Sequence, residues 1–261
     1  YNVIFCNPNK QNYKLDKDIL ENFNGTILTA STGLNHIDIK YCNDNNIKVL
    51  SLTKDYDLIN NLPSTAELAF GLMCSMLRNI LSSFADVKVG GWDYDMFMGH
   101  QLQGKTIGII GCGRLGKMMI KYCRAFGMNV LKYDPYVIKG GNTFDYIVEN
   151  SDILSLHVHA NDETKYMINK KVLGKLKKNS YIVNTSRGEI VNEHDIVDAL
   201  RSGKLKGYAT DVIEDEYGNR ENSPILNGIK EGLNILVTPH VGGMTWEGQH
   251  KAYMWSIGKL K

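Results

Sequence analysis

The sequence predicts an α/β protein built from two doubly wound lobes, each with a parallel sheet. Short apolar runs alternate with stretches of helical periodicity through most of the 261 residues. Such alternation is typical of parallel strands joined by right-handed crossover helices. The run NNLPS at residues 60–64 interrupts the alternation, because Asn, Pro and Ser favour turns. We therefore expect one lobe before this break and a larger one after it.

In the first lobe we expect three strands and two helices. The strands are predicted at residues 1–6, 26–30 and 47–52, and the helices at 16–23 and 37–43. After the break, Pro63 and Ser64 are typical of a helix start. Leu68, Leu72 and Met76 then recur at helical spacing, which predicts one long helix over residues 65–84.

The larger lobe continues the same alternation. Strands are expected at residues 106–110, 129–133, 152–158, 181–185, 208–212 and 235–238. Helices are expected at 117–126, 169–176 and 192–201, with a last one from about residue 244. Asn192 suits the N-cap of the helix at 192–201, and Asp195 stands three residues on, where a reciprocal capping partner is found.

The run GCGRLG at residues 111–116 lies between the strand at 106–110 and its helix. Gly111 permits a tight turn, Gly113 leaves the backbone open to a ligand, and Gly116 lets the helix pack close to the sheet. The helix start offers unpaired N–H groups and a partial positive charge. This order of elements binds the pyrophosphate of a dinucleotide, with Arg114 and Leu115 completing the turn.

Asp134 stands eighteen residues after Gly116, at the end of the next strand. Its carboxylate can accept hydrogen bonds from both ribose hydroxyls of an adenosine and would repel a 2′-phosphate. We therefore predict a Rossmann cofactor domain that binds NAD rather than NADP. The alternative is a tight strand-to-helix turn that binds nothing.

The composition argues against several other classes of protein. The chain is 43% hydrophobic and 22% charged, as is usual for a globular protein with a buried core. A net charge of +2 without a basic block indicates no nucleic-acid partner, and the apolar runs are too short for a membrane span. Five cysteines without a CxxC pair favour reduced thiols in a cytoplasmic protein. Because the first residue is Tyr1, we expect an internal piece of a longer chain.

Several runs at the expected strand ends carry a family resemblance. They are NTSRGEIVNE at 184–193, DVIEDE at 211–216 and TPHVGG at 238–243. Together with STAE at 64–67 and the glycine turn, they resemble the signature runs of the NAD-dependent D-2-hydroxyacid dehydrogenases. Ligands of open parallel sheets bind beyond the carboxyl ends of the strands, so these runs fall where one cleft is expected.

The resemblance implies three catalytic residues. The forked N–H donors of Arg187 would hold the 2-oxo oxygen and the carboxylate of the substrate. His240 would be the general acid/base, a role that suits imidazole at neutral pH. Glu216 would orient the ring and stabilise its protonated form, although Glu214 and Asp215 are equally acidic and the choice depends on the family register. The alternatives are a surface arginine, a hydrogen-bonded turn histidine and a solvated acid.

The resemblance also assigns binding residues. His157, Thr185 and Asp211 would lie beside the cofactor, with Asp211 towards its nicotinamide end. The substrate's carboxylate would meet backbone N–H groups in the loop of Ser31, Thr32 and Gly33. No metal site is expected, because the His-x-His pair at residues 157–159 has no third ligand nearby.

By the same resemblance, residues 62–241 would form the cofactor domain. Residues 1–61 and 242–261 would form a smaller, discontinuous, flavodoxin-like substrate domain that is truncated at both ends relative to the family. The expected partners are a small 2-oxoacid or 2-hydroxyacid and a second copy of the chain, bound through the cofactor domain with residues 92–100 as a candidate contact. An arginine typical of phosphoglycerate-using members is absent at Cys6, which argues against that substrate.

Two functions are compatible with these features. The first is an NAD-dependent oxidoreductase that interconverts D-2-hydroxyacids and 2-oxoacids by hydride transfer. The alternative is a non-enzymatic NAD(H)-sensing regulator, similar to transcriptional corepressors that share the fold. NADH binding without turnover would distinguish the second from the first.

Overall fold

The structure is a computed structural model that describes residues 2–6, 14–34, 36–216, 218 and 220–259. The chain divides into two compact units, Tyr1–Ser64 with Gly243–Lys261, and Thr65–Gly242. The predicted boundary after residue 61 lies three residues before the first division, and the one after residue 241 lies one residue before the second. Tyr1, where the first predicted strand begins, lies outside the described residues.

The first unit contains a three-stranded parallel sheet in the order β1-β2-β3. Its strands are β1 (Val3–Cys6), β2 (Thr26–Thr29) and β3 (Lys48–Leu50). Its helices are α1 (Lys17–Leu20), α2 (Ile39–Asp44), the 3-10 turn η1 (Leu52–Lys54), α3 (Tyr56–Ile59) and α11 (Trp246–Gly258). Buried apolar side chains of β2 and α1, among them Ile27 and Leu20, pack with Cys42 of α2 to form its core.

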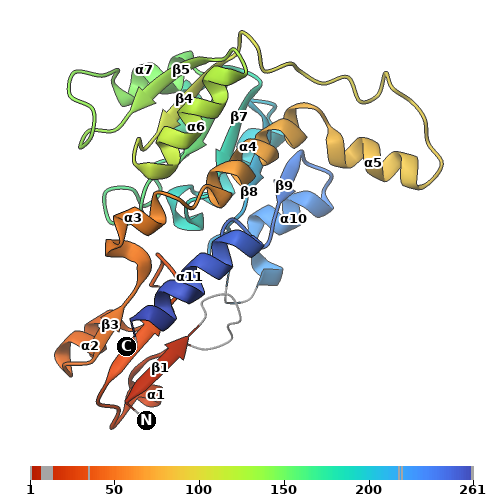
Figure 1. Cartoon of the computed structure of the whole chain (residues 1–261). Helices are drawn as coiled ribbons and strands as arrows, with labels where there is room; N and C mark the ends of the chain where they lie inside the picture. The colour runs from red at the N-terminus through yellow and green to blue at the C-terminus, as the bar shows by residue number, and fades with distance from the viewer. Residues whose placement is uncertain (1, 7–13, 35, 217, 219, 260–261) are drawn as a thin grey trace. The chain divides into compact units, whose positions relative to one another are not determined.

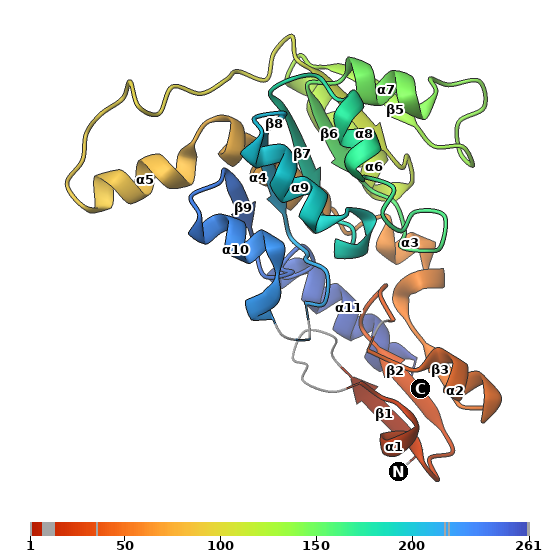
Figure 2. The same cartoon turned by 180° about the vertical axis from the view of Figure 1, so that it is seen from behind.

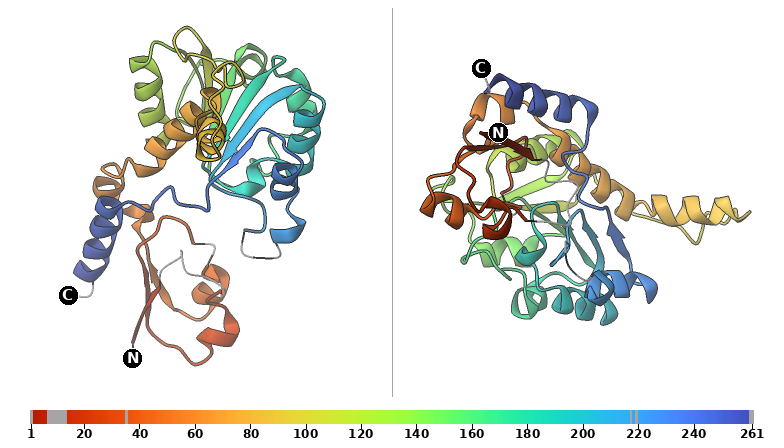
Figure 3. Two further views of the ribbon diagram at one scale, coloured as in Figure 1. Left: turned by 90° about the vertical axis from the view of Figure 1, so that its right-hand side faces the viewer. Right: turned by 90° about the horizontal axis from the view of Figure 1, so that it is seen from below.

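The second unit contains a six-stranded parallel sheet (Figures 1 and 3). Its strands are β4 (Thr106–Ile110), β5 (Asn129–Tyr133), β6 (Ile153–Leu156), β7 (Ser180–Asn184), β8 (Leu205–Thr210) and β9 (Ile235–Val237). Their order is β5-β4-β6-β7-β8-β9, so the chain leaves β4 to one side for β5 and returns to its other side for β6. This reversal beside β4 is the point at which open α/β sheets bind ligands.

Helices cover both faces of this sheet (Figure 2). One core layer joins the strands to α7 (Phe144–Asn150), α8 (Lys170–Lys175), α9 (Glu193–Arg201) and α10 (Pro224–Lys230). The other joins them to α4 (Ser64–Leu77) and α6 (Arg114–Ala125). Successive strand residues face opposite layers, as Ile109 and Ile110 do. The α/β class with parallel sheets is therefore confirmed.

The predicted single helix over residues 65–84 is wrong. The structure has two helices, α4 and α5 (Ile80–Lys88), separated at Asn79, whose φ is +53°. A left-handed residue stops a right-handed helix, and Asn is among the few residues that adopt this conformation readily. The Asn79 side-chain amide also donates to the carbonyls of Phe97 and Met98, at 3.3 and 3.4 Å. The chain therefore turns, and α5 leads away from the sheet (Figures 1 and 3).

The reciprocal capping partner predicted for α9 is also wrong. Asn192 does cap the helix, since its side chain accepts from the Asp195 N–H at 3.1 Å. The Asp195 carboxylate, however, accepts from the Lys170 N–H at 2.8 Å. The Asn192 N–H donates instead to the Ile168 carbonyl, so a contact distant in sequence replaces the local one. The short helices α3, α7 and α10 were not predicted.

All five cysteines are free thiols. Within the described ranges, no single helix has both the length and the apolar character that a membrane span requires. The stretch from Tyr56–Leu77 to Ile80–Lys88 meets that test only as two helices bent by 63°.

Candidate active site

The glycine turn after β4 has a distinct geometry at each glycine. Gly111 has φ +90°, and a Cβ there would stand 2.5 Å from the His157 carbonyl oxygen. A Cβ at Gly116 would stand 2.0 Å from the Gly111 carbonyl oxygen, so α6 and the turn are in backbone contact there. A Cβ at Gly113 would meet nothing within 4 Å. Gly111 and Gly116 thus pack against other backbone atoms, and only Gly113 of the three leaves space beside it.

Asp134 is bound to this turn. One carboxylate oxygen accepts from the Cys112 N–H at 2.8 Å, and the other accepts from the N–H groups of Tyr136 and Val137 at 3.0 Å. Asp134 therefore holds the turn in shape, a structural role that sequence reasoning missed. Burial, together with the Asp134 charge, raises the pKa of the Cys112 thiol to about 11, so this cysteine is neutral and a poor nucleophile.

Two buried polar atoms that lack a partner among the described residues lie just past the carboxyl ends of β6 and β7. His157 and Thr185 follow the paired strand ends Leu156 and Asn184 on β6 and β7. In the described structure, His157 Nδ1 and Thr185 Oγ1 are buried without a hydrogen-bond partner, while His157 Nε2 lies 2.8 Å from Ser155 Oγ. Burial lowers the pKa of His157 to about 4, so its ring is neutral. Unsatisfied buried polar atoms at the carboxyl ends of neighbouring strands fit a bound group that supplies partners.

Arg114, at the start of α6, lies next to this turn and is partly buried. Burial lowers the pKa of its guanidinium, which remains protonated at any physiological pH. Leu115 follows it in the first turn of the helix and is half-buried. Both residues thus stand in the run that was predicted to hold the cofactor.

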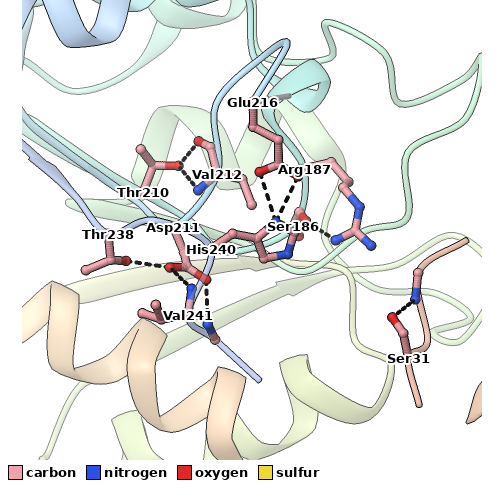
Figure 4. Close-up of polar contacts among 12 residues, drawn as sticks. Ser31, Ser186, Arg187, Thr210, Asp211, Val212, Glu216, Thr238, His240 and Val241 are labelled. Carbon is pink, nitrogen blue, oxygen red and sulfur yellow. Dashed lines mark hydrogen bonds and ion pairs between the residues drawn. The ribbon is translucent and has the colours of Figure 1, made fainter. Parts of the chain in front are cut away.

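His240 and Glu216 form the central pair of the candidate site (Figure 4). The Glu216 carboxylate oxygens lie 2.8 and 2.9 Å from His240 Nδ1. The other two candidate acids differ, since the Glu214 carboxylate accepts from the Tyr166 hydroxyl and Asp215 is exposed with φ +53°. Of the three neighbouring acids, Glu216 is the one that meets the imidazole.

Asp211 anchors the turn that carries His240. Its carboxylate accepts from the Thr238 hydroxyl at 2.5 Å and from the N–H groups of Val241 and Gly242 at 2.8 and 2.7 Å (Figure 4). The Asp211 carbonyl also accepts from the His240 N–H at 2.9 Å, where His240 has φ +54°. Sequence reasoning assigned Asp211 to the cofactor and missed this anchoring role, which depends on contacts thirty residues apart.

Arg187 lies in the loop after β7, half-buried. Its Nη1 donates to the Ser186 carbonyl at 2.6 Å (Figure 4), and its own carbonyl accepts from the Asn184 side chain at 2.9 Å. Among the residues placed by the structure, no carboxylate forms an ion pair with its guanidinium. The cation is therefore available to an anionic ligand. Arg187, Asp211 and His240 follow three adjacent strands, β7, β8 and β9.

The loop of Ser31, Thr32 and Gly33 follows β2 in the first unit. The Gly33 N–H donates to Ser31 Oγ at 3.0 Å (Figure 4), and the Thr32 carbonyl accepts from Thr53 Oγ1 at 3.0 Å. One of the amides expected to bind substrate is thus already engaged within the loop, a contact that the prediction did not include. Within the described part of the chain, no group of three or more His, Cys, Asp or Glu residues could hold a metal ion.

A parallel sheet with a glycine turn at its switch point, an acid after the next strand and an imidazole–carboxylate pair defines a dinucleotide-binding α/β protein. Residues 70–242 match the family described as D-isomer specific 2-hydroxyacid dehydrogenase, NAD binding domain. The chain belongs to this family, and NAD is the cofactor of the matched domain.

Individual relatives agree with this assignment. The chain is 35% identical over 250 residues to D-3-phosphoglycerate dehydrogenase of Methanocaldococcus jannaschii, covering 92% of this chain and 46% of that protein. It is 33% identical to hydroxypyruvate reductase of Thermotoga maritima, covering 90% and 76%. D-lactate dehydrogenase of Aquifex aeolicus, solved with NAD and lactic acid, superposes with a TM-score of 0.83 at 28% identity, covering 99% and 81%. The chain thus spans less than half of the first relative's length.

Proposed function

We propose that the protein is an NAD-dependent oxidoreductase that interconverts D-2-hydroxyacids and 2-oxoacids. The observation that carries the proposal is the contact of 2.8 Å between His240 Nδ1 and the Glu216 carboxylate. A carboxylate on one ring nitrogen fixes the tautomer and leaves the other nitrogen to exchange a proton with a ligand. Bound NAD would supply the hydride acceptor, and NADH the hydride donor.

His240 would give a proton from Nε2 to the carbonyl oxygen of a 2-oxoacid during reduction and take the hydroxyl proton during oxidation. Glu216 would stabilise the protonated ring by its negative charge. Arg187 would hold the substrate's carboxylate and 2-oxo oxygen through two parallel N–H donors, because its guanidinium has no ion-pair partner in the described residues. Its fixed fork gives the substrate one orientation.

The residues around the glycine turn fit the family's cofactor. The open position at Gly113 would admit the pyrophosphate, and the α6 N-terminus would attract its charge. The unsatisfied Thr185 hydroxyl and His157 ring nitrogen would lie beside the bound cofactor, with Asp134 at the ribose. Asp134 already accepts three N–H groups, and a 2′-phosphate would add charge beside its carboxylate, which favours NAD over NADP.

A turnover panel tests the proposal. The chain is mixed with NADH and with glyoxylate, hydroxypyruvate, pyruvate or longer 2-oxoacids, and NADH oxidation is followed. His240→Gln should lower kcat by about 10²–10⁴-fold, the range for loss of a general acid/base, and leave NADH binding nearly unchanged. His194→Gln is the matched control, because His194 is exposed on α9.

Two results would contradict the proposal. Full turnover by His240→Gln removes His240 from the mechanism. NADH binding without turnover of any 2-oxoacid by the unaltered chain favours the regulator instead. The relatives named above are dehydrogenases and reductases, which gives that alternative no support.

We also propose that two copies of the chain associate through α5 and the segment after it. No residue of α5 is buried, and a nine-residue helix without packing is unstable in water. Phe84 is 65% exposed, and Trp92 and Tyr94 are 85% and 83% exposed. A second copy would cover these aromatic side chains with its own, which is the isologous arrangement of a two-fold dimer.

A further inference from the structure

Glu193 is a buried acid that the proposed mechanism does not use. It is the first residue of α9 and is only 2% exposed, whereas acids in a first helical turn normally face water. The charged groups that act on it within the described structure are the acids Glu214 and Glu189. Neither compensates a negative charge. A buried carboxyl without a cation is costly, so a specific contact must explain its position.

The hydrogen bonds of Glu193 connect it to the segment that carries Glu216 of the candidate active site. One carboxylate oxygen accepts from the Glu214 N–H at 2.7 Å, and the other accepts from the Ser223 hydroxyl at 3.4 Å. Glu214 precedes Glu216 by two residues, and Glu216 is the partner of His240. Glu193 thus fixes the backbone two residues before the carboxylate that meets the imidazole.

The same peptide is fixed from a second side by Gly188. A Cβ at Gly188 would lie 2.1 Å from the Ile213 carbonyl carbon and 2.2 Å from the Glu214 nitrogen. The backbone next to Arg187 therefore packs directly on the Ile213–Glu214 peptide. Two residues of the segment from Arg187 to Glu193 thus hold the Ile213–Glu214 peptide: Gly188 by backbone packing and Glu193 by a hydrogen bond.

We propose that Glu193 is a positioning residue for the reaction: its hydrogen bond to the Glu214 N–H fixes where Glu216 meets His240. The inference rests on the proposed function, because it gives Glu193 a role through the acid/base pair. A neutral side chain with the same acceptor would serve equally well, since the contact needs an oxygen and not a charge.

Three substitutions of Glu193 separate these requirements. Glu193→Gln keeps an acceptor oxygen at the same reach. Glu193→Asp keeps the ionisable carboxyl group but draws it back by one methylene, and Glu193→Ala removes both features. In ¹⁵N-histidine-labelled protein, the Gln variant should keep the His240 Nδ1 signal of the parent. The Asp and Ala variants should move it towards the signal of Glu216→Gln, which lacks the imidazole–carboxylate pair. Glu149→Ala, an exposed acid on α7, should move nothing.

Turnover gives the second measurement. The Asp and Ala variants should lose about 10- to 100-fold in kcat, the order expected for a misplaced catalytic group, with unchanged NADH affinity and an alkaline edge of the pH–rate profile shifted to lower pH. Glu193→Gln should keep the parent's kcat and the parent's pH–rate profile. If Ala does not fold, the Asp and Gln pair still decides the matter.

Two outcomes overturn the inference. The first is a Gln variant that behaves like the Asp variant, which would mean that the ionisable carboxyl group and not the position of its oxygen matters. The second is an Asp variant with the parent's histidine signal and pH–rate profile. If the parent chain turns over no 2-oxoacid, the proposed function fails, while the His240 signal still decides the positioning role.

Discussion

At the scale of single residues, the structure shows how one buried carboxyl affects stability. Burial raises the pKa of Glu193 to about 7, with smaller contributions from the charges of Glu214 and Glu189. The hydroxyls of Tyr166 and Tyr208 also lie within its electrostatic reach. The folded protein therefore holds the Glu193 proton more tightly than the unfolded chain does.

This pKa predicts a pH-dependent stability. Between the ordinary glutamate value of 4.5 and about 7, the folded state binds more protons, so the free energy of unfolding falls as pH rises through this window. Glu193→Gln cannot titrate. It should match the parent at about pH 4, below the window, and exceed it at pH 8 by at most about 3 kcal/mol. Urea unfolding at the two pH values measures the difference, and equal stability of parent and variant at both would contradict the buried, protonated acid.

At the scale of elements, β4, the glycine turn and α6 require glycine at Gly116 and at Gly113 for two different reasons. Gly116→Ala would drive a Cβ into the Gly111 carbonyl, so α6 must shift. We expect a loss of about 1–3 kcal/mol in stability, as for other overpacked sites. Gly113→Ala meets nothing within 4 Å, and its φ of −68° suits alanine.

The two variants form a matched pair. Gly113→Ala should keep the parent's Tm but weaken NADH binding, because the new methyl group fills the space left for the pyrophosphate. Gly116→Ala should lower Tm. Thermal unfolding and a fluorescence titration with NADH measure both properties. A Gly113→Ala protein that binds NADH as the parent does would place the cofactor elsewhere.

At the scale of the whole molecule, the exposed segment formed by α5 and residues 89–98 predicts the oligomeric state. Replacing Trp92 and Tyr94 by Ser removes two largely exposed aromatic side chains, so a dimer held by them should dissociate to monomers at micromolar concentration. Light scattering after size exclusion measures this change. Tyr136→Ser is the control, because Tyr136 is 77% exposed outside this segment. A parent chain that is already monomeric would contradict the proposed association.

The parallel α/β class and the position of the dinucleotide turn could be predicted from the sequence, because both depend on local patterns. Alternating apolar runs and helical periodicity are read over ten or so residues, and strand β5 lies at the predicted residues. The family resemblance further selected Arg187, Glu216 and His240, since signature runs keep their order along the chain.

Contacts between residues far apart in sequence could not be predicted, because no short window of the sequence contains both partners. The helix ends before Asn79, and the Asp195 carboxylate accepts from the Lys170 N–H. The Asp211 carboxylate accepts from the Val241 N–H in the turn that carries His240, thirty residues away. Folding also buries Glu193, which the sequence presents as an ordinary acid in a first helical turn. Hydrogen bonding and desolvation depend on which groups distant in sequence come into contact, and these contacts form only when the chain folds.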